Sequence, residues 1–272
     1  MNGNPSTTEN LRRVFSEGFS ARDIAEPLVS FDVSTSGADA LKIMTAEDFD
    51  VVGVRRDGLV VGSLERQKVG EGSCGDYLQP LDPALLIPDN APLVEVVMGL
   101  ETSPRLFVRV LGAVGGILTM SDLQKPPVRM WLFGMITFLE MRVSRLIEQM
   151  CPNESWKQSI SESRLQKARV FMEERRRRGQ SVELIDCLQF SDKGQIVARS
   201  EEIRKLTRFT SRRQTEKAIR ALESLRNSLA HSQDILSSDW ETIVLLCRDL
   251  DGVIKGTEQV RQVLEGKSIR SP

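Results

Sequence analysis

The first half of the chain contains an internal repeat, and this repeat restricts the possible folds more than any other feature of the sequence. A self-comparison at an offset of 54 positions runs without a gap from about Val33 to Lys68. The identical pairs are Met44 with Met98, Val54 with Val108, Arg55 with Arg109, Gly58 with Gly112, Val60 with Val114, Gly62 with Gly116 and Leu64 with Leu118. Apolar residues match in type at Val33 with Ile87, Ala40 with Val94, Ile43 with Val97 and Val52 with Leu106. So many matches in one frame indicate a duplicated structural unit.

Each copy carries the same order of local signals. An extended stretch leads into a helix that begins among small polar residues, and a two-stranded hairpin and a short polar helix follow. Asp57-Gly58, between two apolar runs, strongly favours a hairpin turn. The expected elements are extended stretches at 32–34 and 85–87, helices at 38–45 and 92–100, and strands at 51–54, 59–61, 106–110 and 114–118. One β-α-β-β-α unit is too small to bury its sheet, so two units should pack together.

The end of the second copy carries a specific motif. Residues 116–123 read Gly-Ile-Leu-Thr-Met-Ser-Asp-Leu, which is similar to the strand-to-helix motif G-h-x-T-x-x-D of CBS domains, where h is an apolar residue. The repeat therefore resembles an α/β CBS pair over residues 15–126, with copies at about 15–70 and 71–126. The resemblance implies a flat disc whose clefts bind an adenine nucleotide (AMP, ADP or ATP) as a regulatory ligand.

The resemblance also implies roles for individual residues of the second copy. Thr119 would hold a phosphate, Asp122 would accept both hydroxyls of a ribose, and the backbone near Leu106 would border the base. In the first copy, Glu65 and Lys68 stand where Thr119 and Asp122 stand in the second, so at most one cleft keeps the ligand chemistry. Asp122 also fits the role of a helix cap in a dimerisation scaffold that binds nothing. Both interpretations stay open.

The character of the sequence changes at Pro126-Pro127, where the prolines disfavour helix in the preceding residue. Residues 1–126 hold 11 Lys and Arg against 18 Asp and Glu, whereas residues 127–272 hold 26 against 20. The basic half is therefore the candidate for a polyanionic partner. Its long helical periodicity predicts an all-α bundle over 127–265, with flexible ends at 1–14 and 266–272. The expected helices are 128–150, 159–178, 181–190, 196–209, 211–230 and 239–264, with a C-cap at Gly179 and a turn at 191–194.

The single histidine of the chain lies at the end of the helix expected at 211–230. The apolar stripe of this helix consists of Ala218, Leu222, Leu225 and Leu229. Arg226, Asn227 and His231 lie off that stripe, and the last two share a face because they are four residues apart. These three residues match the R-N-x-x-x-H motif of HEPN domains, and the helical half resembles that superfamily.

The HEPN resemblance implies a metal-independent endoribonuclease that acts as a homodimer and requires no cofactor for catalysis. His231 would take a proton from the ribose 2′-OH or give one to the leaving 5′-oxygen. Arg226 would hold the pentavalent phosphate, and Asn227 would orient the imidazole or the phosphate. The expected products carry 2′,3′-cyclic phosphate and 5′-hydroxyl ends. The alternative is a helix-end histidine that interacts with the helix dipole beside a solvated arginine.

Basic residues ahead of the motif favour RNA as the partner. Residues 155–220 hold 17 Lys and Arg against 9 Asp and Glu, and such a field attracts a phosphodiester backbone without reading its sequence. The candidates for backbone contacts are Lys205, Arg208, Arg212 and Arg213. Because the aromatic residues are isolated, base stacking is not supported, and a solvated basic helix is the alternative.

Composition limits the remaining function classes. The four cysteines are scattered, without a C-x-x-C pair, and one histidine cannot complete a zinc set, so we expect neither a disulfide framework nor a structural metal. No apolar run reaches the length of a membrane helix, and we expect a cytoplasmic protein without a membrane partner. Two functions fit: a nucleotide-regulated ribonuclease of the stress or antiphage defence type, or a non-catalytic nucleotide sensor whose helical domain mediates dimerisation or partner docking.

Overall fold

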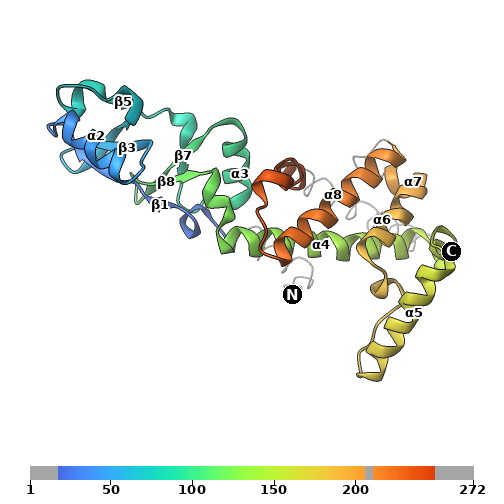
Figure 1. Cartoon of the computed structure of the whole chain (residues 1–272). Coiled ribbons are helices and arrows are strands. Elements are labelled where there is room, and N and C mark those ends of the chain that lie inside the picture. The colour runs from blue at the N-terminus through green and yellow to red at the C-terminus, as the bar shows by residue number, and fades with distance from the viewer. Residues whose placement is uncertain (1–17, 206–210, 249–272) are drawn as a thin grey trace, which may run out of the picture. The chain divides into compact units, whose positions relative to one another are not determined.

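The structure is a computed structural model that describes residues 18–205 and 211–248 (Figure 1). The chain divides into two compact units, Met1–Arg129 and Met130–Pro272, which are described in turn. Outside the described residues lie the flexible ends expected at 1–14 and 266–272, the candidate Arg208, and the end of the helix expected at 239–264. Within the described ranges, no helix combines the length and the apolar character needed to cross a membrane.

The first unit contains two four-stranded sheets, one built around each copy of the repeat. In each copy a short strand pairs in parallel with the first strand of a hairpin, and a helix connects the two. One sheet has the order β2-β3-β4-β5, with β2 (Ser30–Asp32), β3 (Val51–Arg56), β4 (Leu59–Glu65) and β5 (Gln79–Pro80). The other has the order β1-β8-β7-β6, with β1 (Glu26–Pro27), β8 (Ala113–Thr119), β7 (Arg105–Val110) and β6 (Leu86–Pro88). The connecting helices are α2 (Gly37–Ala46) and α3 (Leu93–Thr102).

The two hairpins are equivalent and confirm the prediction from the sequence. β3 and β7 begin 54 residues apart, and so do β4 and β8. Each turn places a residue of positive φ before a glycine, at Asp57-Gly58 and at Leu111-Gly112. Each hairpin also has a register shift at the same place, after Val54 and after Val108. A shared irregularity of this kind supports a true duplication, because bulges are specific local features.

The first strand and helix of the two copies do not keep the offset of 54, so the gapless alignment is wrong there. Phe31 pairs with Val54 in one sheet, and Ile87 pairs with Val108 in the other. Because Val54 and Val108 are equivalent, Phe31 rather than Val33 is the counterpart of Ile87, at an offset of 56.

The buried faces of the two helices confirm this shift. The buried residues Gly37, Ala40 and Met44 of α2 correspond to Leu93, Val96 and Leu100 of α3, again 56 positions apart. The connection from α2 to β3 has four residues, 47–50, whereas the one from α3 to β7 has two, 103–104. The expected pair Ile43 and Val97 is a coincidence of residue type, since Ile43 is 43% exposed and Val97 is fully buried. The matches of Val33, Ala40 and Met44 at the offset of 54 fail for the same reason.

The first strands of the two copies, β1 and β5, are exchanged between the sheets. β1 lies near the start of the first copy but pairs with β8 of the second, with Pro27 opposite Gly116. β5 lies near the start of the second copy but pairs with β4 of the first, with Pro80 opposite Gly62. Each sheet therefore receives one edge strand from the start of the other copy.

The turns ahead of these strands follow the same exchange. In η1 (Ala21–Asp23), the backbone N–H of Ala21 donates to the carbonyl of Ala91 at 2.8 Å. In η3 (Cys74–Tyr77), the backbone N–H of Cys74 donates to the carbonyl of Thr35 at 2.8 Å. The repeat thus extends upstream of the segment found by self-comparison.

The second unit is helical throughout its described residues. The long helix α4 begins at the end of the first unit, with Pro126 and Pro127 in its first turn, where a proline loses no hydrogen bond, and continues into the second unit. The elements are α4 (Pro126–Met150), η6 (Pro152–Ser159), α5 (Glu162–Arg177), η7 (Ile185–Cys187), α6 (Phe190–Arg199), α7 (Glu201–Lys205), α8 (Arg212–Ala230) and a helical segment at 236–248. Gly179 follows α5 with a φ of +79°, as predicted for a C-cap. The predicted stripe of α8 is also confirmed, because all four of its apolar residues are buried.

The segment before α7 differs from the prediction. The helix expected at 181–190 is wrong, since only the short turn η7 forms there, and 191–194 is not a turn but part of α6. α6 begins at this point because Asp192 accepts the backbone N–H of Gln189 in a capping box. Gly194 is needed inside the helix for close packing, since a methyl group there would lie 2.8 Å from Cγ1 of Ile219 on α8. The helix expected at 196–209 is interrupted at Ser200, between α6 and α7.

Candidate functional site

Thr119 and Asp122, the residues expected to bind a nucleotide, form a closed capping box at η5 (Met120–Gln124). One carboxylate oxygen of Asp122, Oδ2, accepts the backbone N–H of Thr119 at 2.7 Å and its hydroxyl at 3.0 Å. The Asp122 side chain is only 7% exposed. The structure therefore brings the two residues together, with the carboxylate engaged in local contacts.

Lys125 occupies the second oxygen of the Asp122 carboxylate. Its ammonium nitrogen lies 2.8 Å from Asp122 Oδ1, donates to the carbonyl of Ile24 at 2.6 Å, and pairs with Glu26 of β1. Burial alone would lower the pKa of Lys125, but the hydrogen bonds to Asp122 and Glu26 outweigh it and raise that pKa. The residue that precedes α4 is thus tied to both the capping box and the exchanged strand.

The same capping box occurs twice more among the described residues of the first unit. Ser20 and Asp23 form it at η1, and Ser73 and Asp76 form it at η3, with backbone N–H to carboxylate distances of 2.7 and 2.8 Å. At η3, hydrogen bonds from the backbone N–H and the hydroxyl of Ser73 lower the pKa of Asp76, and the backbone N–H is the leading cause. A Ser/Thr-x-x-Asp sequence is therefore a general structural device here, and only its surroundings can distinguish a ligand site.

The corresponding residues of the first copy bind each other. Glu65 lies 2.8 Å from Lys68 and 3.5 Å from Arg105 of the second copy. The hydrogen bond from Lys68 is the main reason why the pKa of Glu65 is lowered, with Arg105 contributing less. The other predicted residue, Leu106, is 1% exposed and packs against Gly99, so it can reach a ligand only through its backbone.

The R-N-x-x-x-H residues lie at the C-terminal end of α8. His231 is the C-cap, and its backbone N–H donates to the carbonyl of Asn227 at 3.0 Å. Asn227 and His231 are exposed, whereas Arg226 is half-buried. Only Arg226 is among the residues that line a pocket of about 550 Å³ between α4, α5, α6 and α8.

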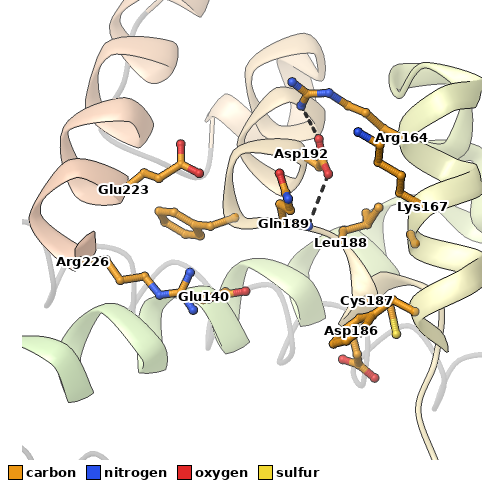
Figure 2. A pocket seen from close by; sticks show the side chains of 13 residues that line it. Glu140, Arg164, Lys167, Asp186, Cys187, Leu188, Gln189, Asp192, Glu223 and Arg226 are labelled. Atoms are coloured by element: carbon orange, nitrogen blue, oxygen red, sulfur yellow. Dashed lines mark hydrogen bonds and ion pairs between the residues drawn. The ribbon is translucent and has the colours of Figure 1, made fainter. Parts of the chain in front are cut away.

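Figure 2 shows this pocket from close by, with Glu223 and Arg226 of α8 on one side and Arg164 and Lys167 of α5 on the other. Its lining residues are Glu140, Arg164, Lys167, Ala168, Phe171, Asp186, Cys187, Leu188, Gln189, Phe190, Asp192, Glu223 and Arg226. The aromatic side chains of Phe171 and Phe190, which lie far from other aromatic residues in the sequence, thus line the pocket beside its charged groups.

Two of the pocket's carboxylates are already paired with cations. Asp192 pairs with Arg164, and Glu140 lies 2.9 Å from the ammonium group of Lys193. The side chains of Asp192 and Lys193 are only 5% and 4% exposed. Removal of one partner from such a pair leaves a buried charge without compensation, which typically costs about 3–5 kcal/mol. These ion pairs hold α4, α5 and α6 around the pocket.

Sequence reasoning missed these pairing residues for a physical reason. Asp192 and Lys193 belong to a segment that resembles a turn in sequence, and their partners lie 28 and 53 positions away. No local signal links residues at such separations. A pair of adjacent opposite charges ahead of an apolar run is the single weak indication that the sequence offers.

The predicted RNA-backbone residues have different surroundings. Lys205 lies 2.9 Å from Glu201 on the solvent side of α7. Arg212 lies 2.8 Å from Glu216 on α8, and Arg213 is exposed. Of these three described candidates, Arg212 lines a second pocket, beside α8.

No family model and no curated protein matches the chain. It is similar to solved CBS-domain structures. One is the CBS domain of a bacterial CNNM/CorC family Mg²⁺ transporter in complex with ATP, with 16% identity over 44% of this chain and 94% of that one and a TM-score of 0.35. Another is CBSX2 in complex with AMP, with 23% identity over 39% and 93% and a TM-score of 0.34. A third is an uncharacterized conserved protein from Pyrococcus horikoshii, with 21% identity over 39% and 90% and a TM-score of 0.35.

At TM-scores below 0.5, these similarities assign neither a site nor an activity to the chain. In the described ranges, no group of three or more His, Cys, Asp and Glu side chains is arranged to hold a metal ion.

Proposed function

We propose that this chain is a nucleotide-regulated, metal-independent endoribonuclease of the HEPN type. One observation carries the proposal: the C-terminal end of α8 presents Asn227 and His231 to solvent while Arg226, one residue away, lines a pocket of about 550 Å³. A base and an amide at an accessible helix end, beside a guanidinium in a cavity, suit an RNA phosphodiester.

The proposed chemistry assigns one step to each side chain. The His231 imidazole removes the proton from a ribose 2′-OH, and that oxygen attacks the neighbouring phosphorus. Arg226 donates hydrogen bonds to the phosphate oxygens, on which negative charge accumulates in the transition state. Asn227 positions the imidazole or the phosphate. The bond between phosphorus and the 5′-oxygen breaks, and that oxygen takes a proton from the imidazolium formed at His231, which restores the neutral imidazole; the products carry a 2′,3′-cyclic phosphate and a 5′-hydroxyl. Because the motif lies on the surface, a second copy of the chain completes the cleft in a homodimer.

The first unit, in this proposal, is an adenine-nucleotide sensor that binds at Thr119 and Asp122. A ribose there must replace part of the hydrogen bonding that Asp122 now receives. Lys125 is the partner that can be exchanged, because Thr119 belongs to the same turn as Asp122. Release of Lys125 frees the residue that precedes α4, which offers a direct connection from ligand to helix.

The experiment compares wild-type protein with His231→Ala and Arg226→Ala on a mixed pool of RNA in the presence of EDTA, with and without AMP or ATP. Arg177→Ala is the matched control, because Arg177 is 80% exposed on α5 and away from the pocket. We expect cleavage by the wild type and the control, and a loss of at least about 100-fold in both motif variants, as is typical of general acid–base and electrostatic groups.

The chemistry of the ends provides an independent readout. A 5′-hydroxyl product accepts phosphate from polynucleotide kinase without prior dephosphorylation. Equal cleavage by His231→Ala, or activity that disappears with EDTA, contradicts the proposal.

A non-catalytic sensor is the second candidate, and one observation favours it. Met130, Phe133 and Met141 lie along one face of α4 and are 63%, 41% and 37% exposed. An apolar helix face of this kind is suited to dimerisation or to docking of a partner. Nucleotide binding without any RNA cleavage, together with dimer dissociation in Phe133→Glu, would favour this function.

A further inference from the structure

A second pocket, of about 390 Å³, opens beside α8 and is rich in arginine. Its charged lining residues are Arg164 of α5, Arg199 of α6, and Arg212, Glu216, Arg220 and Glu223 of α8. Four guanidinium groups thus face two carboxylates. Gly194 and Ile219 also line it, at the close contact between α6 and α8.

Three of the arginines surround a single carboxylate. Arg212 donates to Glu216 at 2.8 Å, and this hydrogen bond is the main reason why the pKa of Glu216 is lowered. Arg220 and Arg199 lower the pKa of Glu216 further through their charges. One carboxylate cannot neutralise three guanidinium groups, so the pocket keeps an excess of positive charge.

The remaining charged residues, Arg164 and Glu223, do not cancel this excess. Arg164 pairs with the buried Asp192, and Glu223 adds one negative charge, so three guanidinium groups still face two carboxylates. Arg199 donates to the carbonyl of Ser159 at 2.7 Å, which fixes its position without neutralising it. Anions are therefore attracted to the part of the pocket between Arg199, Arg212 and Arg220.

The arginine pocket adjoins the pocket that contains Arg226. The two share Arg164 and Glu223 as lining residues. On α8, Arg212, Arg220 and Arg226 fall within a sector of about 120° around the helix axis, at about 100° per residue. Arg226 lies about 9 Å along the axis from Arg220, at a rise of about 1.5 Å per residue.

We propose that the arginine pocket binds the RNA backbone beside the cleavage motif. Its guanidinium groups hold phosphates through paired N–H donors, which fix position and direction without reading the bases. The strand then runs along α8 towards Arg226. This assignment rests on the proposed ribonuclease function, since the continuity with the motif is what favours RNA over another anionic partner.

The test measures the affinity of the full chain for a fluorescent single-stranded RNA of mixed sequence, at several salt concentrations. Arg220→Gln should weaken binding several-fold and reduce the salt dependence of log K by about one unit per lost phosphate contact. Arg177→Gln removes the same charge from an exposed site on α5 outside both pockets, and it should bind almost as tightly as wild type.

Glu216→Gln supplies a result of opposite sign. It removes the carboxylate that competes for Arg212, so RNA should bind several-fold more tightly than to wild type. Because one variant is expected to weaken binding and the other to strengthen it, a general loss of folding cannot imitate the pattern.

The outcomes separate this inference from the proposed function. If wild type binds and cleaves RNA but neither pocket variant differs from Arg177→Gln, the arginine pocket is not the RNA site although the enzyme stands. If wild type binds no RNA, both fail. If polyglutamate competes as well as unlabelled RNA of equal charge, the pocket serves an acidic protein instead, and the assignment to RNA is overturned.

Discussion

At the scale of the residue, the carboxylate of Asp122 has two structural roles. It caps η5 through Thr119, and it binds the ammonium group of Lys125. Asp23 and Asp76 cap their turns in the same way, at the entry to each copy. All three aspartates therefore share the structural role of capping a turn. Of the three, Asp122 is the candidate for ligand binding.

This set gives a controlled prediction. Asp23→Ala, Asp76→Ala and Asp122→Ala should each lose stability, by about 1 kcal/mol for a cap and more at Asp122, where Lys125 also loses a partner. Only Asp122→Ala should lose affinity for AMP or ATP in calorimetric titration. Equal nucleotide affinity in Asp122→Ala and wild type contradicts the assignment of the sensor site, whatever happens to stability.

At the scale of the element, prediction from the sequence succeeds where the signal is local. The hairpin at Asp57-Gly58 and the buried stripe of α8 follow from turn chemistry and helical period, and both are found. The start of α6 is not predicted because a glycine at position 194 is typical of a turn. The packing role of Gly194 depends on Ile219, which lies 25 positions later in the sequence. The shift from 54 to 56 between the copies is missed because residue type alone does not reveal two extra residues in a loop.

In the candidate site, too, the sequence predicts the residues that are local to one helix and misses those that come from other elements. Arg226, Asn227 and His231 are visible in the sequence because they lie within one helical turn or two. The pocket around Arg226 is not, since Glu140, Arg164 and Asp192 reach it from three other elements. Long-range ion pairs leave no periodic trace in the sequence.

The contact between α6 and α8 gives a prediction at this scale. Gly194→Ala should destabilise the protein by about 1–3 kcal/mol in urea unfolding, because the added methyl group overlaps Ile219 and forces the helices apart. The control substitution Gln195→Ala, at the neighbouring half-buried position, should change the stability little.

A second substitution tests the cause. Adding Ile219→Ala to Gly194→Ala should cost less than the sum of the two single substitutions, since it removes Cγ1 and Cγ2, the atoms that block the methyl group. Additive losses in the double variant indicate that Gly194 matters for another reason.

At the scale of the whole molecule, the two compact units lead to a prediction about unfolding. If AMP or ATP binds the first unit, saturating nucleotide should raise the midpoint of the first unit's transition in scanning calorimetry, by mass action on its folded state. RNA bound to His231→Ala should instead raise the midpoint of the transition that belongs to the second unit. Asp122→Ala identifies the first transition, because it should abolish only the nucleotide-dependent shift. A nucleotide-dependent shift that persists in Asp122→Ala contradicts this division of labour.

The exchange of β1 and β5 between the two sheets has a consequence for how such a protein can be taken apart or rebuilt. Neither copy is self-sufficient: cutting the chain between them leaves each piece with an open sheet edge where its borrowed strand had been. The two pieces should restore one another when mixed. Two intact chains that open this contact could likewise each lend the other its leading strand, and a linked pair of molecules would form from the same hydrogen bonds that close one.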